Sequence, residues 1–216
     1  MKSSTLFQKQ SFAGYLIFAL LVFFLAMMSA SCSQSETSEK KTATATKSAA
    51  TKPAETTTSA DKFKTLSSKD TTNDLKLKIN VPADWIERDD LNDVAAVQAS
   101  NKADTLFLAV ISEPKDQFDK GTKLEDYADL VIDHYLEGNE DKAKIKKERV
   151  KTVVNGRPAV QYEIENKANK IVTVTLLYTV VDAPQGFYQI MAWTLNSQWD
   201  EKQSLLRSIT DSFREE

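Results

Sequence analysis

Short connections between strand-like segments constrain the fold of this chain most strongly. Apolar and polar residues alternate from Leu75 to Val81, which predicts a strand with one buried and one solvated face. Further strand-like segments follow at residues 94–100, 105–112, 144–154, 160–165, 171–181 and 187–195. Asn155-Gly156 is a strong two-residue turn signal between two of them. Because short turns join antiparallel neighbours, we expect a largely antiparallel sheet.

Two segments have helical periodicity instead. Thr122 and Glu125 have the spacing of a capping box, which predicts a helix that begins at Thr122 and ends at Gly138-Asn139. Ser197 is predicted to cap a second helix, with Asp200 three residues further on. Apolar stripes define the buried faces: Leu124, Tyr127, Val131 and Tyr135 in the first helix, and Trp199, Leu206, Ile209 and Phe213 in the second. The order strands, helix, strands, helix predicts an α+β domain with helices packed against the sheet.

The N-terminal residues have the pattern of an export signal. Lys2 and Lys9 give a positively charged start, and an uncharged apolar run follows from Phe12 to Met28. Ser29-Ala30-Ser31-Cys32 resembles a bacterial lipobox, with Ser29 at a position that usually holds Leu, Val or Ile. We therefore predict a lipoprotein-type signal peptide over residues 1–31 and lipidation of Cys32.

Two alternatives to lipidation stay open. The apolar run is close to the roughly 18 residues of a membrane span, so the N-terminus is alternatively an uncleaved anchor. Cys32 is alternatively an incidental residue beside an ordinary cleavage site. As the single cysteine of the chain, it excludes an internal disulfide and a zinc site built on several cysteines.

The segment after Cys32 is rich in Ser, Thr and Lys. From Ser33 to Asp61 it has no apolar side chain larger than alanine apart from proline. Such a segment cannot bury enough surface to offset the entropy of ordering, so we predict a disordered tether over residues 32–65. The folded domain is then expected over residues 66–216.

Patterns of catalytic chemistry are missing from the sequence. His134 is the single histidine, and the five glycines form neither a nucleophile elbow nor a phosphate-binding loop. We expect His134 on a helix surface. The carboxylate pairs Asp89-Asp90 and Asp116/Asp119 lie in predicted loops without EF-hand spacing, so a weak calcium site is only a minor alternative. We predict a protein that is not an enzyme and has no metal and no cofactor.

A basic run precedes the Asn-Gly turn. It consists of Lys142, Lys144, Lys146, Lys147, Arg149 and Lys151. It is a possible docking patch for an acidic partner or an anionic lipid, or else an edge strand whose lysines prevent unwanted pairing. No aromatic residue interleaves to stack on bases, and the net charge is only −3, so we predict no nucleic-acid partner.

Trp85 lies just after Pro82, which ends a predicted strand. Its indole is expected to cover the core, and the alternative is a possible cleft aromatic exposed for binding.

Three motifs together resemble PsbP-like domains. Residues 79–85 (INVPADW) resemble their opening strand, and residues 155–159 (NGRPA) resemble their mid-domain turn. Residues 188–194 and 206–213 resemble their closing strand and helix. The resemblance covers about residues 75–213 and implies an α/β/α sandwich around a central, mostly antiparallel sheet. It also implies a role in binding or assembling protein complexes.

Our leading hypothesis is a membrane-anchored lipoprotein outside the cytoplasm, on the cell membrane or outer membrane, that acts as a non-catalytic binding or assembly module. Its expected partners are the membrane, through the N-terminal lipid, and a protein. The alternative is a carrier of a lipid or other small apolar ligand, which a large apolar pocket would favour. A photosystem II-associated subunit is a remote alternative, because residues 75–79 (LKLKI) replace the Gly-Tyr-x-Phe opening of photosynthetic members.

Overall fold

The computed structural model describes residues 62–68, 74–101, 103 and 105–216. The export signal, Cys32 and most of the predicted tether lie outside the described residues. The strands are β1 (Phe63–Ser67), β2 (Leu77–Pro82), β3 (Ile86–Glu87), β4 (Val97–Asn101), β5 (Leu106–Pro114), β6 (Ala143–Val154), β7 (Arg157–Lys167), β8 (Thr173–Asp182), β9 (Gly186–Leu195) and β10 (Arg214–Glu215). The α-helices are α1 (Leu124–Glu137) and α2 (Trp199–Asp211), and the short 3-10 helices are η2 (Lys115–Gln117) and η3 (Asn196–Gln198).

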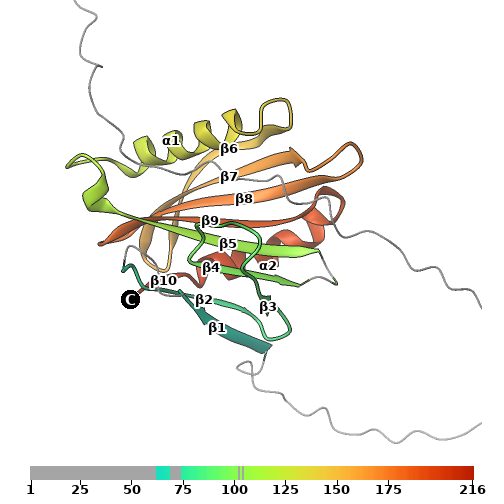
Figure 1. The fold of residues 1–216 in the computed structure, drawn as a ribbon, viewed down its shortest axis with the longest axis horizontal. Helices are drawn as coiled ribbons and strands as arrows, with labels where there is room; N and C mark the ends of the chain where they lie inside the picture. The colour runs from blue at the N-terminus through green and yellow to red at the C-terminus, as the bar shows by residue number, and fades with distance from the viewer. Residues whose placement is uncertain (1–61, 69–73, 102, 104) are drawn as a thin grey trace, which may run out of the picture.

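The strands form two antiparallel sheets. The large sheet has the order β3-β4-β5-β9-β8-β7-β6, and the small sheet has the order β1-β2-β10. Figure 1 shows α1 at the top of the view and the small sheet at the bottom. The predicted antiparallel sheet is therefore confirmed.

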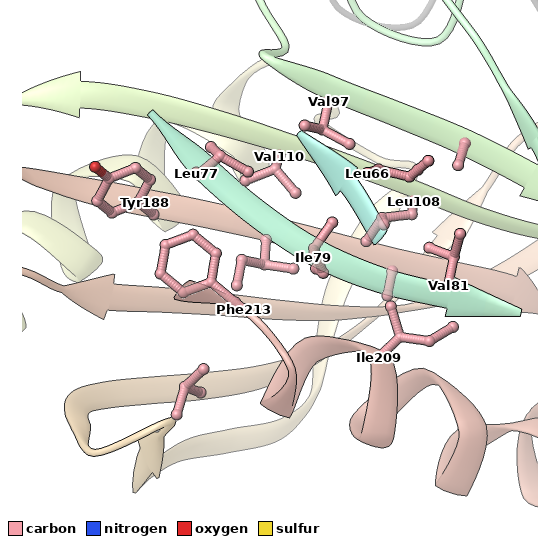
Figure 2. Packing of buried hydrophobic residues seen from close by; sticks show 14 of the residues in the cluster. Leu66, Leu77, Ile79, Val81, Val97, Leu108, Val110, Tyr188, Ile209 and Phe213 are labelled. Atoms are coloured by element: carbon pink, nitrogen blue, oxygen red, sulfur yellow. The ribbon is translucent and has the colours of Figure 1, made fainter. Parts of the chain in front are cut away.

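Two hydrophobic cores lie on opposite faces of the large sheet. Strand alternation separates them, since Val160, Tyr162 and Ile164 of β7 pack toward α1 while Ala159 packs on the other face. The second face is covered by α2 and by β2, whose Leu77 belongs to the same core (Figure 2). This arrangement confirms the predicted α+β class with helices on both faces.

The predicted N-terminal caps of both helices are wrong, whereas α1 ends at Gly138 as predicted. α1 begins at Leu124 without a side-chain cap, and the Thr122 hydroxyl donates to the carbonyl of Asp119 at 2.8 Å. The chain turns at Thr122 before it becomes helical, so this hydroxyl is already engaged. Ser197 lies inside η3, and α2 begins two residues later at Trp199, also without a side-chain cap.

The domain begins earlier than predicted. β1 starts at Phe63, inside the segment 32–65 that the sequence predicts as tether, and it pairs with β2 over five residues. Leu66 is only 4% exposed. The pairing with β2 supplies partners for the β1 backbone, a contribution that local composition does not reveal.

Candidate functional site

The basic run lies on β6, which is the edge strand of the large sheet. Two register shifts interrupt its pairing with β7, between Ile145 and Lys147 and between Lys147 and Val150. Lysines and bulges are both devices that protect an edge from pairing with another strand. The location therefore favours the edge-strand interpretation of the basic run.

Most cations of the basic run already contact a partner within the domain. Four of them form ion pairs, and these are Lys144–Glu165 at 2.9 Å, Lys147–Glu163 at 3.9 Å, Arg149–Asp129 at 2.7 Å and Lys151–Glu125 at 2.6 Å. Lys146 Nζ donates to Asn196 Oδ1 at 3.3 Å. The positive charge available to an external partner is thus smaller than the sequence suggests, and the docking patch stays a prediction.

An open groove lies between α1 and β6. Its volume is about 370 Å³, and its lining consists of Asp129, Ile132, Asp133, Ile145, Glu148, Arg149 and Tyr162. Three of these side chains are apolar or aromatic, and four are charged. We call this feature the α1–β6 groove. A mixed lining of this kind fits the recognition of a polar or charged side chain better than that of a lipid chain.

Asp129 is the polar centre of the α1–β6 groove. Arg149 Nη1 donates to both of its oxygens, at 2.7 and 2.9 Å, and the Tyr162 hydroxyl donates to Oδ1 at 2.9 Å. Burial, together with the hydrogen bond to Asp129, raises the pKa of Tyr162 to about 12. The hydrogen bonds that Arg149 donates to Asp129 also raise the pKa of Arg149 above its ordinary value. Tyr162 and Arg149 therefore both stay protonated at neutral pH.

A second polar network lies beneath α1 and was not predicted. The Tyr127 hydroxyl donates to Glu113, and the amide of Gln189 donates to Glu113 Oε2 and to the Tyr127 oxygen, both at 2.8 Å. The Tyr178 hydroxyl donates to the side-chain oxygen Oε1 of Gln189. Burial, followed by the charge of Glu113, raises the pKa of Tyr127 well above its ordinary value. These groups satisfy one another, so the network orients α1 on the sheet.

The other predicted residues are separate from the groove or buried. The His134 side chain is exposed on α1, as expected. Among the described residues, no group of three or more His, Cys, Asp or Glu side chains is arranged to hold a metal ion. Trp85 is 1% exposed and belongs to the core beneath the small sheet. The cleft interpretation of Trp85 is therefore wrong, because the chain after Pro82 folds the indole inward.

The sequence contained a signal for the α1–β6 groove that our prediction did not use. α1 carries five carboxylates and no Lys or Arg, whereas the strand that follows it is basic. Opposite charge on consecutive elements indicates that they contact each other. Asp129 and Asp133 could have been placed near the basic run on that ground.

The fold defines the class of protein. A helix on each face of an antiparallel sheet, with a small additional sheet, is the PsbP-like α+β architecture. The PsbP family model matches residues 66–215, and the chain belongs to the PsbP family. A comparison with curated proteins gives no match.

Solved structures with a similar fold come from distant organisms. Cyanobacterial PsbP (CyanoP) from Synechocystis has a TM-score of 0.55 and 16% identity, over 71% of this chain and 92% of that chain. LpqN, involved in cell envelope biogenesis of Mycobacterium tuberculosis, has a TM-score of 0.45 and 12% identity, over 72% and 92%. The Ran-binding protein Mog1p of Saccharomyces cerevisiae has a TM-score of 0.41 and 14% identity, over 64% and 89%. At 16% identity the likeness to CyanoP concerns the fold alone.

Proposed function

We propose that this PsbP-family chain is a membrane-anchored lipoprotein outside the cytoplasm that acts as a non-catalytic binding or assembly module. The N-terminal pattern of charge, apolar run and Cys32 supports the anchor and the location. Among the described residues, no helix has the length and apolar character needed to span a membrane. In this proposal the N-terminal segment attaches the protein to the membrane.

The α1–β6 groove carries the proposal of a binding module. It opens at the surface, between a helix and an edge strand, and its charged lining matches a polar partner rather than a hydrocarbon chain. This geometry supports an interaction on the outside of the domain.

The packing of the interior supports a module over a carrier. Both cores consist of closely packed side chains on the two faces of the sheet. A second cavity, beside β6, β7 and α2, has a volume of about 40 Å³, which suits a water molecule rather than a lipid. A carrier would need a much larger apolar cavity or a large opening of the domain.

Native mass spectrometry of the full chain, extracted from its own membrane, tests the proposal. We expect an N-terminal lipid mass and a stoichiometric protein partner. A bound small apolar molecule without a protein would replace the module with the carrier. Photosystem II subunits as the bound proteins would favour the photosynthetic alternative, and a bare lipidated domain would contradict stable assembly.

A further inference from the structure

α1 carries a row of carboxylates at a spacing of four residues. We call Glu125, Asp129, Asp133 and Glu137 the acidic row. Side chains four residues apart lie next to each other on a helix, so like charges at this spacing destabilise it. Asp133 and Glu137 also lie near the C-terminal end of α1, where the helix dipole disfavours negative charge. The row therefore needs cations to compensate it.

β6 compensates only half of the acidic row. Lys151 pairs with Glu125 and Arg149 pairs with Asp129, at 2.6 and 2.7 Å. The Lys151 contact lowers the pKa of Glu125, as expected for a paired carboxylate. Asp133 lies further along the row and has no ion pair with any Lys or Arg that the structure describes.

The bulges of β6 explain why the compensation stops there. They turn Lys147 toward Glu163, on the α2 side of the sheet. Lys146 likewise contacts Asn196, ahead of α2. Glu148 of β6 lines the same groove as Asp133. Two carboxylates, Asp133 and Glu148, consequently line one groove without a cationic partner among the described residues.

An exposed leucine lies beside this groove on the outer face of α1. Leu130 is 56% exposed, although α1 packs its other leucines and its tyrosines toward the sheet. Asp126 and Asp133 lie four residues before and three residues after it, so carboxylates flank it on the same side of the helix. An apolar side chain framed by uncompensated acids is complementary to a segment that carries both an apolar and a cationic residue.

Building on the proposed function, we infer that α1 and the α1–β6 groove dock a basic segment of a protein partner. A Lys or Arg side chain of the partner occupies the groove between Asp133 and Glu148 and so continues the compensation of the acidic row. A neighbouring apolar side chain of the partner covers Leu130. The groove volume of about 370 Å³ accommodates such a side chain.

Charge complementarity selects a basic partner segment over other occupants. The densest run of cations in a second copy of the chain is that of β6, and four of these cations already form ion pairs. An anionic lipid surface would be repelled by Asp126, Asp133, Glu137 and Glu148. A basic segment is the occupant that relieves the repulsion within α1 and removes Leu130 from water at the same time.

Site-specific photo-crosslinking in the source cells tests this inference with the full chain. One variant is Leu130→p-benzoylphenylalanine, and a second places the same photo-crosslinker at Val153, an exposed position on β6. We expect the probe at position 130 to capture a partner peptide with an excess of Lys and Arg and at least one large apolar residue. Adding Asp133→Asn and Glu148→Gln should lower the yield roughly two- to fivefold for each carboxylate removed.

Matched controls separate docking from general charge effects. Asp200→Asn with Glu201→Gln removes two exposed carboxylates from α2 and should leave the yield unchanged. Asp133→Asn relieves like-charge contacts, so its unfolding temperature should not fall. Equal loss of yield with both pairs of substitutions would contradict a specific groove.

The remaining outcomes have distinct meanings. Capture of an acidic segment, of residues 33–61 of the same chain or of a second copy would overturn the inference of a basic protein partner. Capture at position 153 but not at position 130 would also overturn it, while the proposed function would stand. Capture at neither position, with no partner in the native mass spectrum, would contradict both.

Discussion

Arg149 Nη1 contacts both carboxylate oxygens of Asp129, at 2.7 and 2.9 Å, and thereby joins the edge strand β6 to helix α1. The Tyr162 hydroxyl donates to the same carboxylate at 2.9 Å. These three side chains come from three different elements and meet in the α1–β6 groove. Their contacts hold the groove open in a fixed shape while Asp133 and Glu148 face it without a partner among the described residues.

The raised pKa of Tyr162 makes stability depend on alkaline pH. A tyrosine whose pKa is about 12 in the folded chain and about 10 when unfolded stabilises the fold below pH 10, and this contribution is lost as the pH rises toward 12. Between pH 8 and pH 11 the loss from this group is about 1 kcal/mol. In Tyr162→Phe we therefore expect a shallower fall of the free energy of unfolding, measured by urea denaturation at pH 8, 10 and 11.

Tyr162→Phe and the natural chain are compared by the pH dependence of their free energies of unfolding, not by the free energy at a single pH. Tyr162→Phe also removes a hydrogen bond, which costs about 1 kcal/mol at every pH in this range. Parallel curves for the two proteins would show that the Tyr162 hydroxyl titrates near its ordinary pKa.

Phe213 closes the core between the small sheet and the large sheet. Its side chain is fully buried, and its ring centroid lies 4.8 Å from that of Tyr188 (Figure 2). We expect Phe213→Ala to lower the free energy of unfolding by about 3–5 kcal/mol, because it leaves a cavity beneath β2. Ile171→Ala is the control, since Ile171 is 92% exposed and should change stability by less than about 0.5 kcal/mol. If chemical denaturation gave both variants a similar loss of unfolding free energy, this assignment of the core would be contradicted.

Two glycines give a matched pair with opposite expected signs. A Cβ at Gly186 would lie 2.7 Å from Leu75 Cδ1 and 2.8 Å from the Glu113 carbonyl oxygen, so Gly186→Ala should destabilise by about 1–3 kcal/mol. Gly138 has a right-handed helical conformation (φ −65°, ψ −15°), and a Cβ there comes no closer than 3.4 Å to another atom. Gly138→Ala should therefore be neutral or stabilising by up to about 1 kcal/mol. Thermal unfolding of both variants checks the two signs together.

The hairpins and the helices could be predicted from the sequence because local chemistry specifies them. Asn155 and Gly156 both have positive φ, 45° and 78°, as the favoured two-residue hairpin turn requires. The burial of β2 alternates along the strand, as the Leu75–Val81 pattern predicted. The amphipathic stripe of α1 likewise places Tyr127 and Tyr135 in the core.

Charge indicates that α1 and β6 contact each other, but the residue contacts within the α1–β6 groove could not be predicted in the same way, because they depend on register. Only the two bulges of β6 decide that Lys147 contacts Glu163 while Arg149 contacts Asp129. β1 likewise forms because it pairs with β2, and the composition of the β1 residues alone does not reveal this pairing. Pairwise contacts across strands carry this information, and a single sequence read locally does not.

The boundary between tether and domain can be tested by two deletions. Removing residues 33–60 should leave the unfolding temperature unchanged, because this segment is predicted not to pack on the domain. Extending the deletion to Ser67 removes β1 and the buried Leu66, so it should cost at least about 2 kcal/mol. A clear fall in the unfolding temperature after the first deletion would show that the Ser/Thr/Lys-rich segment contacts the domain.

Cys32→Ala tests the predicted anchor. If acyl chains on Cys32 hold the protein at the membrane, the variant should leave the membrane fraction or accumulate as an unprocessed precursor, and its mass should lack the lipid. Ser35→Ala is the control, since it changes a neighbouring residue without removing the thiol.

Cell fractionation and intact-mass measurement distinguish two ways in which the variant could stay at the membrane. Retention with residues 1–31 still attached in both the variant and the natural chain would identify the apolar run 12–28 as an uncleaved anchor. Retention of the processed variant with the same mass as the natural chain, apart from the Cys-to-Ala difference, would mean that the domain itself binds the membrane.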